Sequence, residues 1–156
     1  MKFSHLAKNK IRMVDISQKK LTKRVAKAKC FIKFSKSTFQ KIINNDLSKG
    51  EIFNVARTSG ILASKKTSEL IPLCHNLPLN YINIDFKIHK KEFKIEVLSE
   101  VKTNFSTGVE MEALTACSIS SLVIYDMCKS LDKKMIIENL KLYYKDGGKS
   151  GKFKND

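Results

Sequence analysis

Apolar and polar positions alternate with a period of two in several stretches of the chain, which is the pattern of half-buried β-strands. The first stretch is Val25–Phe34, where lysines are interleaved with smaller and apolar residues. Two further stretches, Tyr81–Ile88 and Phe93–Val97, are separated by the polar pair Lys90–Lys91 and predict a β-hairpin. Met135–Tyr144 predicts a last strand.

Other stretches have helical spacing, with apolar residues three or four positions apart. Thr38–Asn45 predicts a short helix and Glu51–Lys66 a longer one. Gly60 lies inside the second pattern, and it indicates either close packing or a local break. The stretch Gly108–Lys134 also predicts a helix.

The order of these elements is strand, helix, helix, strand, strand, helix, strand. This order predicts an α+β fold, namely a ferredoxin-like split βαβ sandwich in which helices pack on an antiparallel sheet. A length of 156 residues fits a single domain. We expect residues 1–12 to form a flexible basic N-terminal tail, and residues 13–156 to form one domain that ends in a flexible glycine-rich tail.

The helix predicted within Gly108–Lys134 is apolar on nearly all sides. Its large apolar side chains do not fit one stripe: Met111, Leu114, Ile119, Leu122, Val123, Ile124 and Met127. One sheet cannot cover all of that surface, so we expect a second subunit to bury the remainder.

A formal net charge of +15 favours an anionic partner, which leaves nucleic acids, nucleotides and phosphorylated metabolites open. Proteins that stack bases usually interleave aromatic and basic side chains, whereas the aromatic residues here mostly follow the strand alternation. Beside an enzyme, a small basic nucleic-acid-binding module is the alternative interpretation. A structural subunit with solvent-facing charges is a third.

The sequence contains no signal for export or membrane insertion, since residues 1–10 lack an apolar core and no apolar run is long enough to predict a span. Four scattered cysteines favour reduced thiols over disulfides or a zinc site. We therefore expect a cytoplasmic protein without a membrane partner, a bound metal or a cofactor.

Asp126 and Lys129 form the first candidate site. A carboxylate at the end of a long apolar stretch is costly unless a partner or a function accounts for it. Lys129 is three positions further on, and so lies on the same helical face. The pair is either a catalytic acid–base unit or an ordinary ion pair at a helix end. Glu112 precedes Asp126 by fourteen positions, about 20 Å along a helix, which suits two ends of an extended site or two sites shared across a subunit boundary.

His75 is the second candidate, because it lies in a loop between Pro72 and Pro78. It is either a hydrogen-bonding or proton-shuttling group or a structural histidine. The glycine-rich segment Gly147–Gly151 lacks the spacing of a nucleotide-binding P-loop, but its backbone N–H groups and Lys149 could approach a phosphate.

Four segments taken together resemble the cyclic pyranopterin monophosphate synthase family, the MoaC type of molybdenum cofactor biosynthesis. They are Met13–Ser17 (MVDIS), Lys49–His75 (KGEIFNVARTSGILASKKTSELIPLCH), Thr107–Lys129 (TGVEMEALTACSISSLVIYDMCK) and Gly147–Phe153 (GGKSGKF). The segments LIPLCH, GVEMEALTA and YDMCK are long and specific.

This resemblance implies a lyase that converts 3′,8-cyclo-7,8-dihydroguanosine 5′-triphosphate to cyclic pyranopterin monophosphate and releases pyrophosphate. It also implies a hexamer, a trimer of dimers, with sites at subunit boundaries. It assigns catalysis to Asp126 and Lys129. The residues that it implies in substrate binding are Leu73, Cys74, His75, Met111, Glu112, Lys49, Lys65, Lys145 and Lys149.

Overall fold

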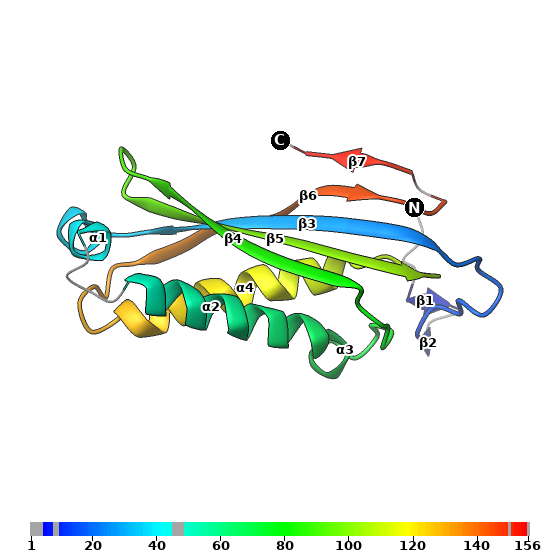
Figure 1. The fold of residues 1–156 in the computed structure, drawn as a ribbon. Helices are drawn as coiled ribbons and strands as arrows, with labels where there is room; N and C mark the ends of the chain where they lie inside the picture. Colours follow the sequence, from blue (N-terminus) through cyan, green and yellow to red (C-terminus); the bar gives the residue numbers. More distant parts are fainter. Residues whose placement is uncertain (1–4, 8–9, 45–48, 150, 156) are drawn as a thin grey trace.

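The structure is a computed structural model that describes residues 5–7, 10–44, 49–149 and 151–155. One antiparallel sheet forms a layer, and two long helices cover one of its faces (Figure 1). This is the predicted α+β architecture.

The sheet has five strands in the order β4-β5-β3-β6-β7, and every neighbouring pair is antiparallel. The strands are β3 (Thr22–Lys33), β4 (Tyr81–His89), β5 (Lys94–Phe105), β6 (Ile136–Asp146) and β7 (Phe153–Lys154). The central strand β3 lies between β5 and β6. The predicted hairpin is β4 and β5, which begin to pair at His89 and Lys94. Strands β3, β4, β5 and β6, with the helices that connect them, reproduce the split βαβ order.

The helices are α1 (Lys36–Ile43), α2 (Lys49–Lys65), α3 (Thr67–Leu70) and α4 (Glu110–Cys128). Helix α1 starts two residues before the predicted helix, because the Ser35 hydroxyl caps it by accepting a hydrogen bond from the Thr38 N–H. The predicted last residue of that helix, Asn45, lies outside the described residues. Helix α4 ends at Cys128, so it is shorter than the stretch in which it was predicted.

Small residues allow α2, α4 and the sheet to approach closely. A Cβ atom at Gly60 would lie 2.8 Å from the carbonyl oxygen of Ala116, and would also overlap Ile84 and Ser120. The Ser120 hydroxyl donates a hydrogen bond to the Ala56 carbonyl at 3.0 Å. Gly60 therefore marks close packing and not a break, since α2 is continuous around it. These contacts also make the two helices antiparallel, so the start of α2 lies beside the end of α4.

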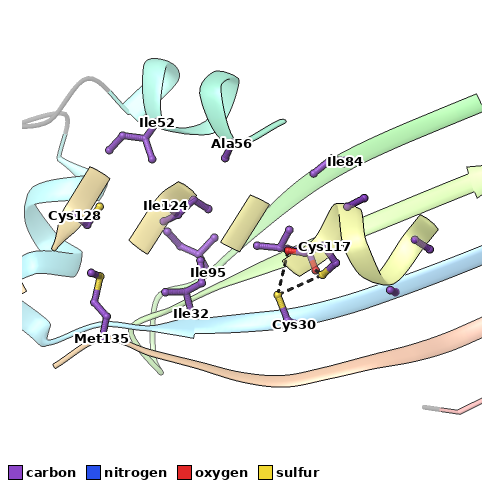
Figure 2. Close-up of a cluster of buried hydrophobic side chains, with 14 of the residues drawn as sticks. Cys30, Ile32, Ile52, Ala56, Ile84, Ile95, Cys117, Ile124, Cys128 and Met135 are labelled. Atoms are coloured by element: carbon purple, nitrogen blue, oxygen red, sulfur yellow. Dashed lines mark hydrogen bonds between the residues drawn. The ribbon is translucent and has the colours of Figure 1, made fainter. Parts of the chain in front are cut away.

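Alternation along β3 points Ala26, Ala28, Cys30 and Ile32 into the core, and all four are fully buried. Figure 2 shows Cys30 and Ile32 in this core. Helix α4 packs on β3, β5 and β6 and also on α2. It is long and apolar enough to cross a membrane, but those contacts make it a core helix of this domain.

Three features were not predicted. Residues Leu6–Ala7 and Lys10–Ile11 pair as two short strands, β1 and β2, within the expected N-terminal tail. Helix α3 forms one turn after α2. Strand β7 pairs back onto β6, with Phe153 opposite Lys145, so the C-terminal segment adds an edge strand to the sheet.

Candidate functional site

A cavity of about 270 Å³ lies where the loop after α3 meets the start of α4. Five residues implied in substrate binding line it together: Leu73, Cys74, His75, Met111 and Glu112. They come from segments more than thirty residues apart in the sequence. The geometry therefore brings the loop candidate and the helix candidates to one place.

The ring of His75 is held by its Nε2 atom, which lies 2.7 Å from the carbonyl oxygen of Val14. A carbonyl only accepts, so Nε2 carries the hydrogen and Nδ1 is left as the other ring nitrogen. Val14 belongs to the MVDIS segment and also lines the cavity. That segment thus orients the histidine, although Val14 and His75 are sixty-one residues apart in the sequence.

Glu112 is the most perturbed acid of the cavity. Its side chain is only 4% exposed, and burial, with a smaller contribution from the charge of Glu110, raises its pKa to about 7. Burial also raises the pKa of the Cys74 thiol, and the nearby charge of Glu112 acts in the same direction. A carboxyl group with a pKa near neutrality can either give or take a proton at physiological pH.

A second cavity, of about 660 Å³, adjoins the first and shares Lys19, Thr107, Gly108 and Glu110 with it. Its other lining residues are mostly basic or small: Lys20, Thr22, Arg24, Ser106, Gly148 and Lys149. A concentration of cations next to a smaller polar cavity suits an extended ligand with several phosphate groups.

Arg24 reaches this cavity from β3, and one of its terminal nitrogens donates to the Ser106 carbonyl at 3.4 Å. Its Nε and the hydroxyl of Thr22 are buried and have no hydrogen-bond partner among the described residues. Gly148 has a φ of 78° and packs against the guanidinium so closely that an added Cβ would overlap it. The glycine-rich segment is therefore shaped around Arg24.

Lys145 lies on β6, and its ammonium group contacts the Glu110 carboxylate at 3.0 Å. Glu110 lines both cavities. Of the four lysines implied in substrate binding, Lys149 lines the basic cavity and Lys145 reaches a wall residue of both cavities. Lys65 is exposed at the end of α2. Lys49 begins α2, and its side chain lies outside the described residues.

Asp126 and Lys129 are at the opposite end of α4. The ammonium group of Lys129 donates to Asp126 Oδ1 at 2.6 Å, and this contact raises the pKa of the lysine. Their side chains are 69% and 61% exposed for Asp126 and Lys129, respectively. The two residues meet, as their spacing predicts, but neither lines the two cavities described above, and within one chain they face solvent. Glu112 is about 20 Å away along the helix.

Sequence reasoning missed the contributions of Lys19, Lys20, Thr22 and Arg24 to the basic cavity. They lie in a segment whose lysines look like ordinary surface charges. The signal that could have identified Arg24 is that it is one of three arginines in a lysine-rich chain. Within the described ranges, no cluster of three histidine, cysteine or acidic side chains has the geometry to hold a metal ion.

A split βαβ sandwich with a polar cavity next to a cation-rich cavity is the arrangement of an enzyme that would suit a small phosphorylated molecule. The profile of the MoaC family matches residues 13–148. The chain belongs to the MoaC family, a family of lyases of molybdenum cofactor biosynthesis. It is therefore an enzyme, and neither a nucleic-acid-binding module nor a structural subunit.

Curated relatives cover nearly the whole chain. A protein from Bordetella parapertussis named cyclic pyranopterin monophosphate synthase is 45% identical over 154 residues, covering 98% of this chain and 96% of the relative. Relatives with the same name come from Clostridium botulinum, at 51% identity over 144 residues, with 92% and 91% covered, and from Peptoclostridium acidaminophilum, at 43% over 157 residues, with 100% and 99% covered. The predicted resemblance is thereby confirmed.

Proposed function

We propose that this chain converts 3′,8-cyclo-7,8-dihydroguanosine 5′-triphosphate to cyclic pyranopterin monophosphate and pyrophosphate. The observation that carries the proposal is the cavity in which Leu73, Cys74, His75, Met111 and Glu112 meet, together with the family membership. In this proposal the pterin-forming part of the substrate occupies the smaller cavity, and the triphosphate extends into the basic one.

The basic cavity accounts for the phosphate chemistry. Formation of a cyclic monophosphate joins a hydroxyl oxygen of the substrate to the α-phosphorus, and the bond from that phosphorus to pyrophosphate breaks. Negative charge builds up on the departing pyrophosphate, and cations placed around it stabilise that charge. Arg24, Lys145 and Lys149 are the groups that we assign to this task.

Ring opening and pyran closure need proton transfers, which we assign to Asp126 and Lys129. In a single chain the pair is exposed and about 20 Å from Glu112, so one chain cannot bring the pair to the ring-forming part of a substrate that lies beside Glu112. We therefore propose that a second copy supplies the opposite end of α4. In a two-fold dimer with antiparallel α4 helices, the end of one helix lies beside the start of the other.

Exposed apolar side chains support this arrangement. Leu122 and Met127 on α4, and Val55 and Leu62 on α2, are between 39% and 54% exposed on the helical side of the sandwich. Large apolar groups gathered on one face favour a protein contact. We therefore propose the family's hexamer, a trimer of dimers, in which each site is closed at a subunit boundary. We also propose a cytoplasmic location.

The reaction is tested by incubating the purified protein with the cyclised GTP intermediate. We expect release of pyrophosphate, together with a pterin that becomes fluorescent after oxidation. Binding of the intermediate without pyrophosphate release would contradict the proposal.

The shared site is tested by complementation between two inactive variants, Asp126→Asn and His75→Ala. If each site uses one end of α4 from each subunit, co-expressed variants regain activity, because a mixed dimer contains one site with both wild-type halves. Random pairing makes half of the dimers mixed, so we expect about a quarter of the wild-type activity. Activity no higher than that of either variant alone would contradict a shared site.

A further inference from the structure

Cys30 and Cys117 lie side by side in the core, although they come from elements far apart in the sequence. Cys30 is on the central strand β3, and Cys117 is in the middle of α4. Both side chains are fully buried, and their sulfur atoms are 3.3 Å apart (Figure 2). Neither residue lines the cavities of the proposed reaction.

The contact is polarised. The Cys117 thiol donates a hydrogen bond to the Cys30 sulfur, and it also lies 3.5 Å from the Val97 carbonyl oxygen. This hydrogen bond lowers the pKa of Cys30, and it raises the pKa of Cys117 because the shared proton stays on the Cys117 sulfur. Cys30 is therefore the sulfur that ionises first, and a thiolate is the nucleophilic form of cysteine.

We propose that Cys30 and Cys117 form an intramolecular disulfide when a hydroperoxide reaches the core, so that α4 becomes covalently tied to β3. In the first step the Cys30 thiolate attacks a peroxide oxygen and the O–O bond breaks. Cys30 becomes a sulfenic acid, and the departing hydroxide or alkoxide takes up the proton that Cys30 released on ionising and leaves as water or an alcohol. In the second step the Cys117 sulfur attacks the Cys30 sulfur, the S–O bond breaks, and the departing hydroxide takes the Cys117 proton and leaves as water.

The geometry favours this pair over the other cysteines. A disulfide requires the sulfur atoms to approach from 3.3 Å to about 2.05 Å, a movement that a small shift of α4 supplies. Cys128 is eleven residues further along α4, about 16 Å away along its axis. Cys74 lines the smaller cavity on the loop after α3. Because the pair is fully buried, the reaction rate follows local opening between α4 and the sheet.

The test uses the full-length protein treated with hydrogen peroxide, then denatured, alkylated and digested without reduction. We expect a mass loss of about 2 Da in the intact chain before alkylation, and after digestion a peptide that joins the segments of Cys30 and Cys117. Trypsin leaves Cys117 and Cys128 in one peptide, since no lysine or arginine lies between them. The Cys128→Ala variant therefore assigns the bond, and it should form the cross-link as the wild type does. Cys117→Ala should not form it.

The tie between β3 and α4 is tested by thermal unfolding. The oxidised protein should melt roughly 5–15 °C higher than the same sample after reduction, whereas Cys117→Ala should show no reversible difference. Free Cys30 and Cys117 after treatment that has oxidised Cys74 would overturn the proposal, and so would cross-links only between subunits. A Cys30–Cys117 bond without a rise in melting temperature would show that the link between β3 and α4 does not stabilise the fold as proposed. The wild-type peptide map decides the question even if a cysteine variant does not fold.

Discussion

Lys145 on β6 donates a hydrogen bond to Glu110 at the start of α4, across 3.0 Å. The pair stands where the polar and the basic cavities meet, since Glu110 lines both. The contact holds the ammonium group of Lys145 in place at this junction. In the proposed reaction a substrate phosphate competes with Glu110 for that group.

Replacing Lys145 with alanine should weaken substrate binding. Loss of one charge-assisted contact to a phosphate costs about 1.4 kcal/mol or more, so KM should rise roughly ten-fold. Steady-state kinetics with the cyclised intermediate measures the effect. Lys90→Ala is the matched control, because it removes the same charge from the exposed turn of the hairpin. Equal changes in KM for both variants would show that only the net charge of the protein matters.

Glu112 should make stability depend on pH. Its pKa is about 7 in the folded protein and 4.5 as an ordinary side chain, so the folded state binds more protons between these values. The contribution of Glu112 to the free energy of unfolding is therefore largest below about pH 4.5, and it is lost as the pH rises through about 7.

When the pH is raised from 5 to 8, the free energy of unfolding of Glu112→Gln should therefore increase by about 2–3 kcal/mol relative to that of the wild type. Urea unfolding at the two pH values measures this difference. Glu51→Gln is the control, because Glu51 is an exposed acid in the first turn of α2. If Glu112→Gln and the wild type keep the same difference at both pH values, Glu112 does not titrate in this range.

Asp126→Asn and Lys129→Ala should each abolish product formation, because the proposed proton transfers need both groups. Their exposed side chains make little structural contact, so each variant should melt within about 2 °C of the wild type. Pyrophosphate release and thermal unfolding are measured on the same preparations. Normal turnover by either variant would leave the pair as an ordinary ion pair at a helix end.

Gly60→Ala should destabilise the fold although alanine favours helices. The added methyl group overlaps Ser120, Ile84 and the backbone of α4, and overpacking of this kind costs about 1–3 kcal/mol. Thr58→Ala, at an exposed position of the same helix, should be close to neutral. Denaturant unfolding of the two variants compares them. A Gly60→Ala variant at least as stable as the wild type would mean that α2 moves away from α4 without cost.

Most of the fold could be predicted from the sequence because its signals are local. The alternation of apolar and polar residues along β3 reflects which side chains face the core. The hairpin turn is marked by Lys90 and Lys91 between two alternating stretches. Strand β7 could not be predicted in this way, since Phe153–Lys154 is too short to show a period and pairs only because β6 offers an edge.

The candidate site divides in the same manner. The sequence alone nominated His75, Glu112, Asp126 and Lys129 for the chemistry that we propose, because the family motifs that contain them are contiguous segments. Tertiary structure decided that His75 and Glu112 share one cavity while Asp126 faces solvent at the far end of α4. It also decided that Cys30 lies against Cys117. Contacts between distant segments depend on how a helix and a strand pack. The period within one segment shows which of its faces is buried, but not which residue of another segment lies against that face.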